Sequence, residues 1–142
     1  MKGIVTVSIL GVLMAGYLVL PGCLLPGVAV DMSIAEYYKA AESVQLGDSK
    51  EKVLAAFEKA QNTLPAEVRR SPEKYTEGGV SVEIYYFRSS RTPDYVSTDD
   101  EYTPYIFNDD RLVAIGWATL GGPKTRARPA ERVKVDADIH HY

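Results

Sequence analysis

The stretch Val80-Ser81-Val82-Glu83-Ile84-Tyr85-Tyr86-Phe87-Arg88 decides the fold class, because its side chains follow a period of two. Successive side chains of a strand point to opposite faces of a sheet. The face that we expect to lie in the core holds Val80, Val82, Ile84 and Tyr86. The opposite face holds Ser81, Glu83, Tyr85 and Phe87. The pattern predicts a strand over residues 80–88 with one strongly buried face.

Two further strands are predicted on the C-terminal side of this one. Residues 89–101 are polar and carry four carboxylates, which predicts an exposed loop. Residues 102–107 and 112–120 are rich in strand-forming side chains, and the turn residues 108–111 separate them. Proline has no backbone N–H for the ladder, so we expect Pro104 near the start of its strand or at a bulge.

Two helices are predicted ahead of the strands. Residues 33–44 place apolar side chains at spacings of three and four, with Ser33 as the N-cap. A second helix opens at Asp48 or Ser49, where Asp48 and Glu51 have the spacing of a capping box. The side chains expected on its inner face are Val53, Leu54, Phe57 and Ala60 or Gln61.

The order of these elements predicts an α+β domain over residues 33–123. Two N-terminal helices pack on a three-stranded antiparallel meander, giving a two-layer sandwich. Residues 62–79 contain two prolines and a Gly-Gly pair, and are predicted as a long connection with a helical turn near residues 66–70. Residues 124–142 are dominated by charged and small side chains and are predicted to be a disordered tail.

The N-terminal segment has the composition of an export signal. Lys2 is the only charged residue before Asp31, and an apolar run follows it. A basic start, an apolar stretch and a small residue before the cleavage point are typical of secretory signal peptides. We therefore predict that residues 1–22 are a signal peptide or membrane segment and that residues 23–32 are a linker.

The tetrapeptide Leu20-Pro21-Gly22-Cys23 resembles the lipobox of bacterial lipoproteins, in which the cysteine receives a diacylglycerol and becomes the mature N-terminus. The resemblance implies lipid attachment at Cys23, the only cysteine. Because Leu24 is not the aspartate that retains lipoproteins in the inner membrane, it implies an outer-membrane location facing the periplasm.

Two alternatives to lipidation stay open. The apolar run is long enough for a transmembrane helix, which would be an uncleaved inner-membrane anchor with a periplasmic domain. Ordinary cleavage near Val28-Ala29-Val30 would release a soluble protein.

Three segments of the domain share a family pattern. They are the opening of the second helix at residues 45–53, the aromatic run Ile84-Tyr85-Tyr86-Phe87, and the hairpin at residues 106–113 with its acidic turn and Arg111. In their order, and after a lipobox-like signal, they resemble the SmpA/OmlA family of small outer-membrane lipoproteins, which have the BamE-like fold. The resemblance implies a non-enzymatic protein that supports outer-membrane assembly or integrity by binding proteins.

No set of residues in the sequence is typical of catalysis, cofactor binding or a metal site. His140 and His141 lie in the predicted tail, where side chains are rarely preorganised. The acidic residues 99–101 lack the spacing and the glycine of a calcium loop. Pro123 removes an amide that a phosphate-binding loop at residues 121–125 would need. The net charge of -3, without a basic stripe, argues against nucleic-acid binding.

Aromatic side chains are the remaining candidates for a binding surface. The chain has 10 tyrosines and 1 tryptophan, and tyrosine is favoured at interfaces. The candidates are Tyr85, Phe87, Tyr95, Tyr102 and Trp117. The alternative is that Tyr85, Phe87 and Trp117 pack beneath the helices or the connection.

Two functional hypotheses follow. The first is an envelope lipoprotein, attached to the membrane by its lipid, that binds outer-membrane assembly proteins. The second is a small periplasmic module of the same fold that binds a ligand or inhibits an enzyme, using the acidic loop at residues 94–101.

Overall fold

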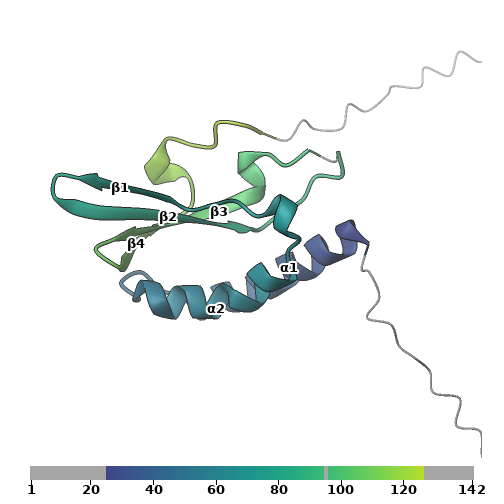
Figure 1. Cartoon of the computed structure of the whole chain (residues 1–142), viewed down its shortest axis with the longest axis horizontal. Coiled ribbons are helices and arrows are strands. Elements are labelled where there is room, and N and C mark those ends of the chain that lie inside the picture. Colours follow the sequence, from purple (N-terminus) through teal and green to yellow (C-terminus); the bar gives the residue numbers. More distant parts are fainter. Residues whose placement is uncertain (1–24, 95, 127–142) are drawn as a thin grey trace, which may run out of the picture.

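The computed structural model describes residues 25–94 and 96–126, which form two helices and a four-stranded antiparallel sheet. The elements are α1 (Pro26–Ala41), α2 (Lys50–Thr63), β1 (Glu73–Glu77), β2 (Val80–Arg88), β3 (Tyr102–Asn108) and β4 (Arg111–Ile115). Three short 3-10 helices join them: η1 (Ala66–Val68), η2 (Asp99–Glu101) and η3 (Ala118–Leu120). Both long helices lie in one layer on the same side of the sheet (Figure 1). The predicted α+β architecture is confirmed, with four strands in place of three.

The helix α1 begins at Pro26, seven residues before the predicted start at Ser33. Proline suits the first turn of a helix because its missing N–H needs no partner there. Ser33 is not an N-cap. It is buried, and its hydroxyl donates a 2.8 Å hydrogen bond to the carbonyl of Ala60 in α2. Residues 26–32 of the predicted linker are therefore helical.

The helix α2 is capped by Ser49, whose hydroxyl accepts a 3.2 Å hydrogen bond from the Lys52 amide. The sequence had predicted a capping box formed by Asp48 and Glu51. The Asp48 carboxylate instead accepts bonds from the Gln45 amide and the Lys52 ammonium group, both at 2.8 Å. This carboxylate thus fixes the turn between the two helices as well as the start of α2.

The strand β1 lies in the predicted connection and was missed from the sequence. Its five side chains, EKYTE, are all exposed, so it has no apolar period. Glu77 pairs with Val80 across a two-residue turn made by Gly78 and Gly79, whose φ angles are +57° and +82°. Hairpin turns of this type need positive φ at both positions, and glycine provides it without strain. The Gly78-Gly79 pair was the one feature of the sequence that could have predicted this hairpin.

Pro104 lies near the start of β3, as predicted, whereas the predicted end of the last strand is wrong. Pro104 is the third residue of β3, and its carbonyl accepts a 2.8 Å bond from the Gly116 amide. In an antiparallel strand, the N–H and the C=O of one residue point toward the same neighbouring strand. The N–H that Pro104 lacks would therefore point toward Gly116, where β4 has already ended. The predicted strand 112–120 stops at Ile115, and η3 follows.

The helices cover the face of β2 that carries Tyr85 and Phe87, which is the face opposite to the one predicted. Phe57 of α2 stacks on Phe87 with ring centroids 4.2 Å apart and contacts Tyr105 at 5.0 Å. Tyr37 of α1 stacks on Phe57 at 5.3 Å. Phe57 itself is fully buried, so this aromatic cluster is the main core.

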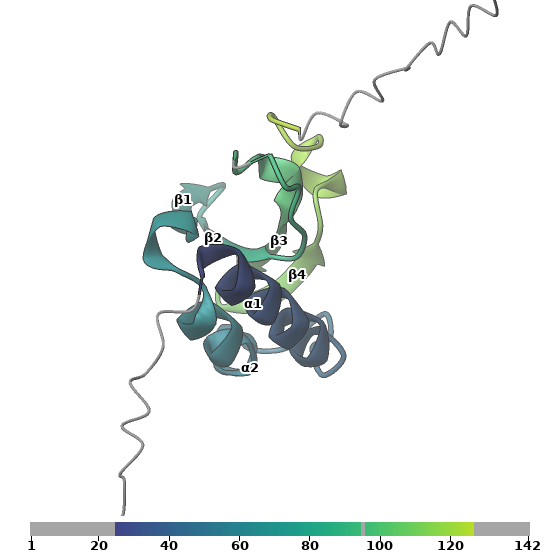
Figure 2. The same cartoon turned by 90° about the vertical axis from the view of Figure 1, so that its right-hand side faces the viewer.

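The predicted core face of β2 lies in a second, smaller cluster on the other side of the sheet. Val82, Ile84 and Tyr86 are buried there, with Trp117 and Leu120 packed against them. Because both faces of β2 are covered, the alternation in the sequence could not tell which face meets the helices. The sheet curves around this side, as the end-on view shows (Figure 2).

Phe57→Ala is expected to lower the free energy of unfolding by about 3–5 kcal/mol, because it removes the ring on which Phe87 and Tyr37 stack. Leu46, which is 64% exposed, provides the control. Leu46→Ala should change the value by less than about 0.5 kcal/mol. Urea unfolding followed by the fluorescence of Trp117 measures both. Similar losses for the two variants would contradict the assigned core.

Candidate functional site

The five aromatic residues predicted as a binding surface do not form one surface. Phe87 is 2% exposed in the main core, and Tyr102 is 6% exposed in the second cluster. Tyr85 is half-buried on the helix side, and Trp117 is half-buried on the other side. Tyr95 and the predicted lipid site Cys23 lie outside the described residues. For Tyr85, Phe87 and Trp117, the structure follows the alternative of packing within the domain.

Tyr85 belongs to a charged cluster at the start of α2. Its hydroxyl donates a 3.0 Å bond to Glu83, which also pairs with Lys50 at 3.0 Å and Lys74 at 3.3 Å. Burial would raise the pKa of Glu83, but the hydrogen bonds from Lys50, Tyr85 and Lys74 outweigh it and hold that pKa below its ordinary value. Bonds to Asp110 and Glu83 raise the pKa of Lys50. These charges neutralise one another, and the cluster joins α2 to the sheet.

Trp117 belongs to a second polar group, on the opposite face. Its indole N–H donates a 2.7 Å bond to the carbonyl of Tyr102. The guanidinium of Arg70 lies 3.7 Å from the centre of the Tyr86 ring and 5.6 Å from that of Trp117. Burial, together with the hydrogen bond to Glu73, raises the pKa of Tyr86 to about 12. Both rings are therefore held by intramolecular partners.

A hollow in the described part of the chain lies between the start of α1, η1 and the loop 89–98. Its volume is about 550 Å³, within the range of small-molecule sites. Six apolar side chains line it: Pro26, Val30, Pro65, Val68, Pro93 and Val96. No pattern in the sequence indicates this pocket, because its walls come from three segments far apart in the chain.

A buried ion pair shapes one wall of the pocket. The side chains of Arg88 and Glu101 are 4% and 1% exposed, and their nearest atoms are 2.9 Å apart. Arg88 also donates to the Ser90 carbonyl at 3.0 Å and to the Ser97 hydroxyl at 2.8 Å. Glu101 accepts bonds from the backbone amides of Thr92 and Thr98. The loop predicted to be exposed thus ends in a buried carboxylate that holds it against β2.

A second ion pair links the loop to α1 across the pocket. Arg91 binds Asp31 through two hydrogen bonds, each 2.9 Å long. A Cβ atom on Gly27 would lie 3.1 Å from a guanidinium nitrogen of Arg91, so a larger residue there would require the Arg91 side chain to shift slightly. Arg88 and Arg91, the two arginines that line the pocket, are both paired with carboxylates. The apolar side chains are therefore the main surface that a ligand could contact. The pocket is suited to an apolar group rather than to an anion.

Neither helix of the described ranges is long and apolar enough to cross a membrane. Residues 25–94 and 96–126 hold no group of three or more His, Cys, Asp or Glu side chains placed to bind a metal ion. His140 and His141 lie outside these ranges. Comparisons of the chain with protein-family models, with curated proteins and with solved structures give no match.

Arg88→Met is expected to lower the free energy of unfolding by about 3–5 kcal/mol, since it leaves the Glu101 carboxylate buried without its counterion. The double variant Arg88→Met with Glu101→Gln should recover part of this loss. The amide carries no charge to leave unpaired, and its single oxygen can still accept one of the two backbone bonds from Thr92 and Thr98, which end on different carboxylate oxygens of Glu101. Urea unfolding of the three chains measures the effect. A double variant less stable than Arg88→Met would contradict the pairing.

Proposed function

We propose that the protein is a non-enzymatic envelope lipoprotein, anchored through Cys23, whose domain binds proteins that assemble or maintain the outer membrane. The observation that carries this proposal is the spacing between the lipobox-like Leu20-Pro21-Gly22-Cys23 and the domain. Only Leu24 and Leu25 separate Cys23 from the first residue of α1. The folded domain would therefore lie directly at the membrane surface.

The start of α1 argues against release by cleavage near residues 28–30. Ala29 and Val30 are 7% and 5% exposed within α1, and Val30 lines the pocket. Cleavage there would remove the first turn of the helix and the pocket wall that it forms. Attachment at Cys23 leaves the whole helix intact.

The contacts between two of the family-like segments support the SmpA/OmlA resemblance. The Gly47 amide donates to the Leu112 carbonyl at 2.7 Å, and the Leu112 amide donates to the Asp48 carbonyl at 2.9 Å. The Lys50 amide donates to the Asp110 carbonyl at 2.8 Å. The opening of α2 and the β3–β4 hairpin thus form one structural unit, which is a reason for them to recur together in a family.

The edge of β4 beyond Leu112 is the surface that best supports protein binding, because Leu112 itself is already bonded to Gly47 and Asp48. Val113 and Ile115 are 44% and 42% exposed there, and β4 pairs with β3 on its other side. The opposite edge, β1, carries Glu73, Lys74 and Glu77, and charged side chains protect an edge from pairing. An extended segment of a partner could add a strand at β4.

Cys23→Ser tests the anchor. Wild-type protein extracted from membranes should have an intact mass equal to residues 23–142 plus about two or three acyl chains, since stable anchoring needs about two. The variant should keep the mass of the complete unmodified chain, because lipidation and the cleavage that depends on it are blocked. The thermal unfolding midpoint should not change. A wild-type mass equal to the unmodified chain would contradict the proposal.

The pocket favours a second candidate function, a module that binds a small apolar ligand. Deleting residues 94–101 cannot test it, because this would remove Glu101 and leave Arg88 unpaired. Filling the pocket is a cleaner test. Val68 lines the pocket, whereas Ala66, in the same 3-10 helix, is exposed and does not.

Val68→Trp should abolish ligand binding if the pocket is a ligand site, and Ala66→Trp should preserve it. Native mass spectrometry of the purified full chain measures this as a non-covalent mass increment. The increment is expected in wild type and in Ala66→Trp, and is expected to be absent from Val68→Trp. No increment in wild type, or an equal increment in both variants, would reject this function.

A further inference from the structure

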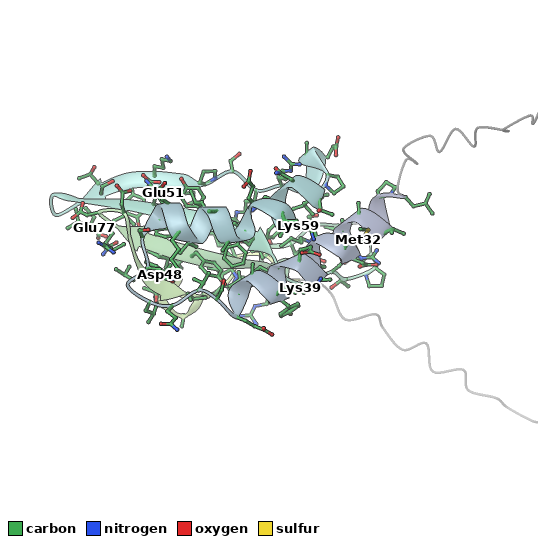
Figure 3. All side chains as sticks on the ribbon, turned by 90° about the horizontal axis from the view of Figure 1, so that it is seen from below. Met32, Lys39, Asp48, Glu51, Lys59 and Glu77 are labelled. Carbon is green, nitrogen blue, oxygen red and sulfur yellow. The ribbon has the colours of Figure 1, made fainter. Side chains whose placement is uncertain are left out.

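The N-cap residue Leu25 and the first two turns of α1 carry an exposed apolar stripe. Leu25, Val28 and Met32 are 73%, 44% and 47% exposed, and spacings of three and four residues place them on one side of the helix. The same side continues toward the C-terminus with Glu36 and Lys39, which form a 3.1 Å ion pair. Figure 3 shows Met32 near the outer end of α1 and Lys39 farther along the helix. The apolar part of this side is thus confined to the end next to Cys23.

The orientation of the stripe is fixed by the buried residues on the other sides of the helix. Ala29, Val30 and Ser33 are buried, and the hydroxyl of Ser33 is bonded to α2. The two bonds between Asp31 and Arg91 attach the same turns to the loop 89–98. Turning the stripe inward would break these contacts, so the three apolar side chains stay at the surface.

The short length of chain between Cys23 and the stripe indicates that the lipid surface covers the stripe. Two residues span at most about 7 Å, so Leu25 must lie within about 7 Å of the anchoring residue. The apolar face of an interfacial helix is buried about 5–10 Å into the boundary between headgroups and acyl chains. With Cys23 at the membrane surface, Leu25 is therefore inside the interfacial layer, and Val28 and Met32 follow it on the same side.

We infer that Leu25, Val28 and Met32 dock on the lipid surface and set the orientation of the domain on the membrane. This inference rests on the proposed anchoring at residue 23, and it holds equally for an acylated Cys23 and for an uncleaved apolar anchor that ends there. The pocket is lined by Pro26, Gly27 and Val30, on the side of α1 opposite the stripe. Docking through the stripe consequently leaves the pocket directed away from the lipid.

Environment-sensitive fluorophores on single cysteines test the docking. Val28→Cys and Met32→Cys carry the label in the stripe, while Lys39→Cys and Leu46→Cys are exposed controls on the same helix and beyond its far end. The full chain is placed in phosphatidylcholine vesicles that contain spin-labelled lipid. A second set of labelled variants also carries Cys23→Ser, so that the introduced cysteine is the only thiol in each chain. The uncleaved apolar segment holds these chains in the membrane. Thermal unfolding confirms that every labelled chain is folded.

Labels at residues 28 and 32 should emit at shorter wavelength and be quenched several-fold more by spin-labelled lipid than labels at residues 39 and 46. Iodide in the water should show the reverse order. Equal quenching by iodide at all four positions would overturn the inference. So would protection from both quenchers at residues 28 and 32, since that would mean coverage by protein.

The intact mass of the same samples separates this inference from the proposed lipidation. An unmodified mass combined with lipid quenching at residues 28 and 32 would reject the lipoprotein while supporting the docked helix. A lipidated mass combined with iodide quenching at these positions would support the lipoprotein and reject the docked helix.

Discussion

Burial of β2 on both of its faces is the constraint on which the rest of the structure depends. Phe87 packs under the helices, while Ile84 and Tyr86 pack on the other side of the sheet. An antiparallel sheet often leaves one face in water, so double burial requires a cover on each side. The helices form one cover, and η3 with Arg70 forms part of the other. The strand then ends in Arg88, whose buried pairing with Glu101 extends the same constraint into the loop.

That loop in turn fixes the N-terminal end of the domain. Arg91, three residues beyond β2, holds Asp31 in the second turn of α1, and the pocket lies between them and η1. A helix that begins three residues after Cys23 and is tied to the body of the domain cannot act as a flexible tether. With the proposed anchor at Cys23, the distance and the orientation of the domain relative to the membrane would be set by the fold.

Much of the fold was predictable because its signals are local. The period of β2, the turn between β3 and β4 and the apolar spacing of both helices indicated the α+β class. The features that were missed depend on contacts between distant residues. The start of α1 merges with the apolar N-terminal segment in composition, β1 has no apolar side to reveal it, and Glu101 lies in a run of carboxylates typical of exposed loops. Its burial depends on Arg88, thirteen positions away. The pocket combines three such segments, so no single motif could indicate it.

Hydrogen exchange of the first two turns of α1 tests most directly the claim that the domain starts at the anchor without a linker. The Ala29 amide bonds to the Leu25 carbonyl at 3.2 Å, which begins the helical ladder. Amides from Ala29 to Ser33 should therefore exchange far more slowly than unstructured amides, in detergent micelles as well as in vesicles, with α2 as the internal reference. Exchange at unstructured rates over these residues, while α2 stays protected, would contradict the account.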